Sequence, residues 1–174
     1  VLLDMVAEVA ERYRLRSERF LLHGFSGGGH FAHRFLFIHP ERLLGVSIGA
    51  PGIVTLLDPD HDFWVGVRNF ETVFGKRLDI DAMRHVPVHM VIGGEDKETW
   101  EIRLTPQDSW WMAGAEGLAE ANRLERLAAL RQNLESHGIG VRQDIVPGVG
   151  HDGRAMVAVV QDCFAMVLAA ARKG

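Results

Sequence analysis

The sequence predicts an α/β domain built on a mostly parallel sheet of about four strands flanked by helices. Three observations lead to this prediction. Four short apolar runs recur along the 174-residue chain, and segments with helical spacing of apolar residues lie between them. Turn-forming glycine or proline lies close to most of these boundaries. Strands that alternate with helices form βαβ units, and such units give a parallel sheet.

Each element has its own local signal. RFLLH stops at Gly24 and VHMVI stops at Gly93, as buried strands do. A helix after Ser26 ends before Pro40, and Gly138 is a natural helix stop. The segment 63–85 is mixed and predicts two short helical pieces. We therefore expect strands at 19–23, 43–49, 88–92 and 141–146, with helices at 2–13, 27–39, 118–137 and 153–172.

Bulk composition excludes several classes of protein. Hydrophobic residues make up 47% of the chain and the formal net charge is −4, so nothing favours binding to nucleic acid or to an anionic membrane. The longest apolar run, near 157–160, is too short to span a bilayer. Cys163 is the one cysteine, which excludes an internal disulfide. The location stays open, with the cytoplasm favoured.

The candidate nucleophile is Ser26, within Gly24-Phe25-Ser26-Gly27-Gly28. The pattern G-x-S-x-G between a strand and a helix produces a strained, sharp turn that lifts the serine hydroxyl clear of the sheet. At the start of the helix, the backbone N–H of Gly27 is the natural donor to an oxyanion. A glycine-rich turn that only packs, or that cradles a phosphate, is the alternative, but the Walker lysine is absent.

The candidate base is His151, one of nine histidines. It follows the strand at 141–146 through a short loop, and functional groups collect at the carboxyl ends of strands in an open α/β sheet. His61, in a loop, is a weaker alternative. His30 and His33 have the spacing of a metal-binding pair on a helix, but no third ligand suggests itself, so we expect no metal site.

The candidate acid follows the strand at 88–92. Glu95 and Asp96 both lie there, and the short side chain of Asp96 is better suited to hold a histidine in one tautomer. The acidic loop of Asp58, Asp60 and Asp62 is a further option. With Asp96, the chain order is Ser, Asp, His, which is the α/β-hydrolase order.

Three stretches of the sequence together resemble one family. GFSGGGHFAHRFLFIHPERL resembles the nucleophile elbow and following helix of α/β-hydrolase esterases. PVHMVIGGEDKET resembles the strand that carries the triad acid. NRLERLAALRQNLESHGIGVRQDIVPGVGHDG resembles the last helix, strand and histidine of esterases related to dienelactone hydrolases and polyester depolymerases.

The resemblance implies a serine esterase that acts on a small-molecule ester through Ser26, Asp96 and His151, with no metal or organic cofactor. Members of the family have several strands before the elbow and a loop there that gives a second oxyanion donor, whereas one helix precedes Arg19 here. We therefore expect residues 1–174 to be one catalytic domain that lacks the N-terminal half of the α/β-hydrolase fold. A missing segment or another subunit is expected to pair with the strand at 19–23, which would otherwise be an exposed apolar edge.

Segments 50–85 and 97–117 are expected to form the walls of a substrate pocket. Trp64, Trp110 and Trp111 within them are candidate substrate-binding residues, although a large aromatic side chain is more often part of a core. A non-catalytic binding or assembly module with the same fold is the rival interpretation of the whole chain.

Overall fold

The sheet of the protein has four strands, all parallel, in the order β1-β2-β3-β4. The computed structural model describes residues 1–172. Short 3-10 helices at Pro40–Arg42 and Ala115–Leu118 supplement the main elements. The main elements are α1 (Leu2–Tyr13), β1 (Phe20–Phe25), α2 (Gly27–Ile38), β2 (Leu43–Gly49), α3 (Phe70–Phe74), α4 (Ile80–Arg84), β3 (Val88–Gly93), α5 (Arg123–Ser136), β4 (Val141–Val146) and α6 (Val157–Ala171).

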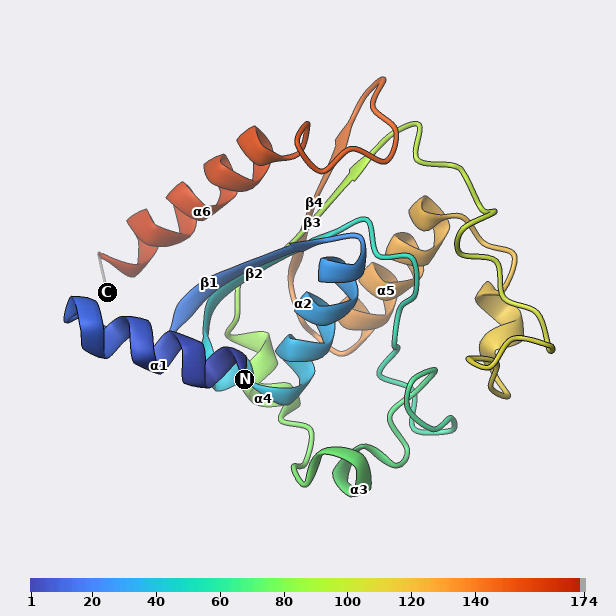
Figure 1. The fold of residues 1–174 in the computed structure, drawn as a ribbon, viewed down its shortest axis with the longest axis horizontal. Helices are drawn as coiled ribbons and strands as arrows, with labels where there is room; N and C mark the ends of the chain where they lie inside the picture. The colour runs from blue at the N-terminus through green and yellow to red at the C-terminus, as the bar shows by residue number, and fades with distance from the viewer. Residues whose placement is uncertain (173–174) are drawn as a thin grey trace.

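Helices cover both faces of the sheet (Figure 1). On one face, α2 and α5 bury the main core against β2 and β3, with Leu36, Leu127 and Met90 fully enclosed. On the other face, a smaller cluster joins Val91 to Val160 of α6. The predicted α/β class with a parallel four-stranded sheet is confirmed.

Two helices begin later than their sequence patterns predict. The helix expected at 153–172 begins at Val157. The expected helix at 118–137 starts at Arg123, because Asn122 and Glu125 form a capping box that fixes the first turn there. Residues 115–118 form a separate 3-10 turn instead. The late start matters for the site, because it places Arg123 and Arg126 in the first turn of α5.

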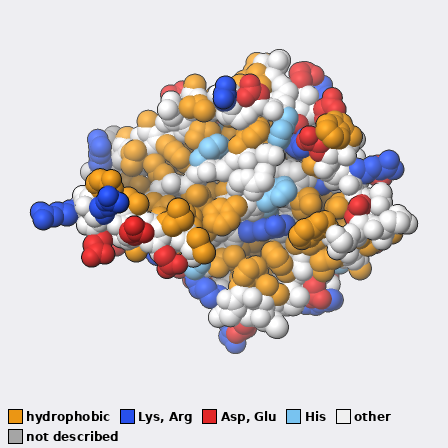
Figure 2. Space-filling model, in the orientation of Figure 1, with side chains coloured by type: hydrophobic (Ala, Val, Ile, Leu, Met, Phe, Trp, Pro, Cys, Tyr) orange, Lys and Arg blue, Asp and Glu red, His pale blue; other side chains and the backbone are white. Residues whose placement is uncertain are grey.

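Strand β1 lies at one edge of the sheet, paired only with β2 among residues 1–172. Its residues are half-buried or exposed, unlike those of β3, which are all buried. Hydrophobic side chains are widespread on the face between α1 and α6 (Figure 2). Beside β1, a shallow groove with an apolar lining is formed by Met5, Val6, Val9, Ala10, Leu15, Arg16, Ser17 and Phe20.

No helix among the described residues is both long enough and apolar enough to cross a bilayer.

Candidate active site

Ser26 lies in the turn between β1 and α2, where its backbone adopts φ 56° and ψ −117°. A non-glycine residue with this conformation is strained, and such strain persists only when the surroundings hold it. The Ser26 N–H donates to the Gly49 carbonyl at 2.9 Å, and the Ser26 carbonyl accepts from the N–H groups of Gly29 and His30. The turn is therefore fixed on both sides by backbone hydrogen bonds.

Gly24 cannot be replaced in this turn by a residue that has a side chain. A Cβ atom on Gly24 would overlap the carbonyl group of Gly28, because the end of β1 and the start of α2 pass so close. A Cβ atom on Gly27 or Gly28 would meet nothing within 4 Å. The glycines of the pattern thus have different tasks, and the close approach depends on the first of them.

The N-terminus of α2 offers unused backbone donors beside Ser26. The first N–H groups of a helix have no partner within it, and no acceptor for the Gly27 N–H is found among residues 1–172. This N–H also lies at the positive end of the helix dipole. The local geometry therefore suits a developing negative charge.

Asp96 lies in the loop after β3, and its side chain is completely buried. The loop is attached to the loop after β4, because the N–H of Gly94 donates to the Val146 carbonyl and that of Glu95 donates to Val149. The neighbouring Glu95 carboxylate points outward, is 60% exposed and pairs with Lys97. Of the two carboxylates in this loop, only Asp96 is directed inward.

His151 contacts Asp96 directly. Its Nδ1 atom lies 2.6 Å from the Asp96 Oδ2 atom, so that Nδ1–H donates to the carboxylate and Nε2 is left available. The imidazole also packs against the ring of Phe25, at 4.8 Å between centroids. Phe25 directly precedes Ser26, so the same ring connects the histidine to the strained turn.

The structure thus brings Asp96 and His151 into contact and places His151 against the neighbour of Ser26. No hydrogen bond joins the Ser26 hydroxyl to His151 within the described chain. In free enzymes, catalytic hydrogen bonds are often long and tighten only with substrate. The geometry is compatible with a serine and a histidine that act together.

Arg123 is a member of the site that sequence reasoning missed. Its NH1 atom lies 3.3 Å from Asp96 Oδ1, and its NH2 atom lies 2.8 Å from Glu101 Oε2. The guanidinium is almost fully buried and partly neutralises the buried Asp96 carboxylate. The signal in the sequence is the capping box of Asn122 and Glu125, which places Arg123 in the first turn of α5, where a cation opposes the helix dipole.

A second histidine–aspartate pair lies elsewhere in the chain. His61 Nδ1 lies 2.6 Å from Asp58 Oδ2, and both side chains are about one third exposed. Hydrogen bonds from the Asp60 N–H and from His61 hold the pKa of Asp58 below its ordinary value. Asp62 pairs with Arg68 instead. The acidic loop is therefore an internally bonded turn with its own histidine.

His30 and His33 point to different partners. The His33 ring is fully buried, donates from Nδ1 to the Gly29 carbonyl and accepts at Nε2 from the Thr55 N–H. Burial lowers its pKa to about 3. The Nε2 atom of His30 accepts from the Ile53 N–H at 2.8 Å. Residues 1–172 contain no group of three or more side chains that could hold a metal ion.

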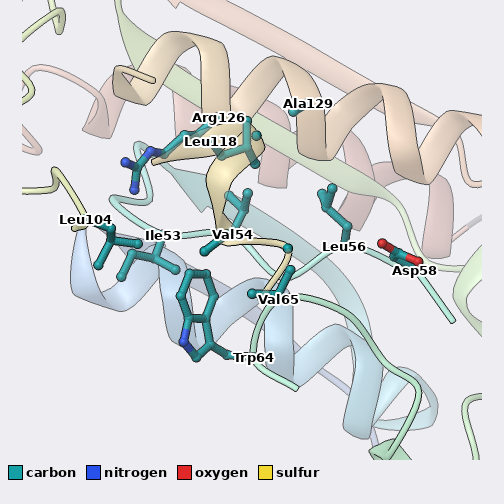
Figure 3. Close-up of a pocket in the computed structure, with 13 residues that line it drawn as sticks. Ile53, Val54, Leu56, Asp58, Trp64, Val65, Leu104, Leu118, Arg126 and Ala129 are labelled. Atoms are coloured by element: carbon teal, nitrogen blue, oxygen red, sulfur yellow. The ribbon is translucent and has the colours of Figure 1, made fainter. Parts of the chain in front are cut away.

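Two cavities share Ile53 and Trp64 in their linings. The first, of about 180 Å³, is enclosed by the segments around 53–65 and 104–118 and by α5. Figure 3 shows the ring of Trp64 along its floor, with the guanidinium of Arg126 at one end and Asp58 at the other. The second cavity, of about 340 Å³, is lined by Trp64 and Trp110 among others. Trp111 lines neither cavity.

Comparison with known proteins places the fold. No protein-family model matches the chain, and no curated protein matches it in sequence. Among solved structures, poly(aspartic acid) hydrolase-1 from Sphingomonas sp. KT-1 is similar with a TM-score of 0.73 at 19% identity, over 91% of this chain and 59% of that one. LpqC, a poly(3-hydroxybutyrate) depolymerase from Bordetella parapertussis, gives 0.70 at 24% identity, over 91% and 54%. A Bacillus cereus carboxylesterase gives 0.52 at 19% identity, over 95% and 58%.

These proteins are all α/β-hydrolase-type enzymes, and this chain spans a little over half the length of each. Similarity at such low identity establishes the fold. The family resemblance of the sequence is confirmed at that level: the chain has the fold of the α/β-hydrolases.

Proposed function

We propose that the chain is the catalytic part of a serine hydrolase that cleaves carboxylic esters through an acyl-enzyme. The observation that carries this proposal is the 2.6 Å contact between Asp96 and His151, next to the strained turn of Ser26. A buried carboxylate that holds one imidazole nitrogen leaves the other as a base, and this arrangement activates a serine hydroxyl. The hydrolases with a similar fold agree with this choice of reaction class.

In the proposed reaction, His151 Nε2 takes the proton of the Ser26 hydroxyl as the oxygen attacks the ester carbonyl carbon. The carbonyl oxygen becomes an oxyanion that accepts from the Gly27 N–H. As the intermediate collapses, the carbon–oxygen bond to the alcohol breaks, and the imidazolium gives its proton to the alcohol. Water then attacks the acyl-enzyme by the same route, which releases the carboxylic acid and restores Ser26.

Asp96 keeps the Nδ1 proton of His151 in place and stabilises the imidazolium when it forms. Its burial makes this stabilisation stronger, because a charge pair interacts more strongly away from water. Arg123 balances the Asp96 charge while the histidine is neutral. In this proposal Arg123 is a positioning residue, since it acts through Asp96.

We further propose that segments 50–85 and 97–117 form the substrate pocket, with Trp64 and Trp110 in its walls. Both side chains line the larger cavity beside α2. The indole N–H of Trp64 donates to the Trp110 carbonyl at 2.8 Å, so the two segments are joined at this point. Aromatic walls of this kind suit an apolar part of a substrate.

We also propose that another strand, from a longer form of the polypeptide or from a second subunit, pairs with β1. The support is the exposed edge of β1 and the apolar groove beside it. Hydrogen exchange tests this proposal: amides on the outer edge of β1 should exchange rapidly in the isolated chain and slowly when the partner is added. Slow exchange of these amides in the isolated monomer would contradict it.

A fluorophosphonate probe tests the central proposal. It should form a covalent adduct on Ser26, identified by peptide mass spectrometry, and the Ser26→Ala variant should not be labelled. The His151→Ala variant should be labelled far more slowly, since the hydroxyl loses its base. Folded protein that stays unlabelled, with native circular dichroism, would instead support a non-catalytic binding or assembly module.

A further inference from the structure

The larger of the two cavities is lined in part by α2, the helix that begins directly after Ser26. Its lining consists of His30, Arg34, Ile53, Phe63, Trp64 and Trp110, and we call it the Arg34 pocket. His30 and Arg34 lie one and two turns after Ser26 on α2. A helix rises about 1.5 Å per residue, so the Arg34 backbone lies roughly 12 Å along the axis from Ser26. Helical side chains lean towards the N-terminus, which brings the guanidinium closer.

Arg34 is the single charged side chain in the lining of this pocket, and it is only partly satisfied. Its Nε atom donates to the Thr55 hydroxyl at 3.1 Å, and its Cζ atom lies 5.3 Å from the centre of the Phe63 ring. The terminal nitrogens have neither an ion pair nor an acceptor among residues 1–172. These nitrogens are not buried without a partner, so they are accessible to solvent, and Arg34 lines the pocket.

Positive charge gathers around His30, which lines the pocket together with Arg34. Arg126 is buried nearby, and its partners are the backbone carbonyls of Gly52, Ile102, Ala119 and Ala121 rather than a carboxylate. Burial, followed by the charges of Arg34, Arg126 and Arg123, lowers the pKa of His30 to about 4. His30 is therefore neutral at pH 7, and Arg34 is the charged group that the pocket offers to a ligand.

We propose that the Arg34 pocket binds a free carboxylate on the acyl part of the substrate, so that the protein prefers half-esters of dicarboxylic acids to neutral esters. The guanidinium would hold the carboxylate through its two terminal nitrogens. The rings of Phe63, Trp64 and Trp110 would cover the methylene chain between the carboxylate and the ester. This inference rests on the proposed function, because it places the ester carbonyl at Ser26.

The test compares two substrates that differ by one charge: 4-nitrophenyl hydrogen adipate and its methyl-capped form, methyl 4-nitrophenyl adipate. We expect kcat/KM to be about 10- to 100-fold higher for the half-ester, the range of a hydrogen bond between charged groups. The preference should be weaker for the succinate pair, whose shorter chain cannot reach from Ser26 to Arg34.

Arg34→Met should abolish this preference, and Arg34→Lys should retain part of it, because lysine keeps the charge but not the two-pronged geometry. Arg131→Met is the matched control. It removes the same charge from an exposed ion pair with Glu135 on α5, and it should leave the ratio of the two kcat/KM values unchanged. Melting temperatures of the three variants report whether each one folds.

Binding of adipate to the Ser26→Ala variant, measured by calorimetry, separates this inference from the proposed function. If no ester is hydrolysed but adipate binds and Arg34→Met removes the binding, the pocket is supported and the proposed function fails. If both esters are hydrolysed equally, or if Arg34→Met leaves the preference intact, the pocket assignment is overturned and the proposed function stands.

Discussion

Two histidine–aspartate pairs in this protein have the same contact distance and different surroundings. His151 and Asp96 are 2.6 Å apart, and so are His61 and Asp58. The Asp96 side chain is completely buried, whereas that of Asp58 is 30% exposed. Asp96 lies in a loop at the carboxyl end of a strand, against Arg123, while Asp58 lies three residues from its own histidine in a turn.

The difference teaches that a short contact does not by itself identify a catalytic pair. A carboxylate three residues before a histidine meets it through local turn geometry. Asp96 and His151 are 55 residues apart in sequence and meet because β3 and β4 are adjacent parallel strands. Of the two pairs, only Asp96 and His151 lie at the carboxyl ends of the strands, where Ser26 is also found.

Alanine substitutions of the two histidines should separate the pairs most strongly. We expect His151→Ala to reduce ester hydrolysis by several orders of magnitude, and His61→Ala to change it by less than about tenfold. The Ser26→Ala/His151→Ala double variant should be little worse than either single variant, because the residues act as a unit. Steady-state kinetics on one activated ester measures all four proteins. A larger loss for His61→Ala would move the base to the other pair.

Asparagine substitutions of the two aspartates should give the next largest difference. Asp96→Asn should lower kcat by about 10⁴-fold, as expected when the histidine loses its fixed tautomer. Asp58→Asn and Glu95→Gln should have mild effects, since neither carboxylate contacts His151. Comparable losses in all three variants would show that the acid lies elsewhere.

Arg123 permits a test of stability rather than of rate. Arg123→Met removes one partner of a buried ion pair, and such changes lower the free energy of unfolding by about 3–5 kcal/mol. Arg131→Met breaks an exposed pair with Glu135 and should cost about 0–1 kcal/mol. Urea denaturation of both variants measures the difference. Equal, small losses would mean that Arg123 is not needed to balance Asp96.

His33, a buried histidine without a carboxylate partner, should give the smallest effect on stability and contrasts with both histidine–aspartate pairs. The pKa of His33 is lowered from 6.5 to about 3 in the folded protein, chiefly by burial. Its contribution to stability is therefore complete above pH 6.5 and is lost as the pH falls, by up to about 1.4 kcal/mol per pH unit. We expect the urea midpoint to decrease between pH 6.5 and 5, and His33→Asn to flatten this dependence.

The fold was predictable from the sequence to a large extent, because strands and helices here carry strong local signals. Strands β2 and β4 have the predicted bounds, and α2 ends before Pro40 as expected, although β1 continues through Gly24 to Phe25. The start of α5 was missed because a capping box overrides the apolar pattern that precedes it. Strand β1 has an apolar sequence typical of a central strand, yet it lies at the edge of the sheet within residues 1–172.

The topology of the sheet predicted where the candidate site residues lie, but it did not predict the neighbouring residue that contacts Asp96. Ser26, Asp96 and His151 each follow a parallel strand, and this is why the sequence could place them at one edge of the sheet. Arg123 belongs to α5, and its contact with Asp96 depends on side-chain packing between segments distant in sequence. The roles of Trp64, Trp110 and Gly27 stay predictions, as do those of the three proposed catalytic residues.

The backbone hydrogen bonds between the loops after β3 and β4 have a consequence for how the candidate site unfolds. Because Gly94 donates to Val146 and Glu95 donates to Val149, these loops extend the ladder of the sheet. Opening them breaks hydrogen bonds that continue the β3–β4 pairing, so we expect the candidate site and the core to open as one cooperative unit. Heat should therefore inactivate and melt the protein at the same temperature, without a folded and inactive state in between.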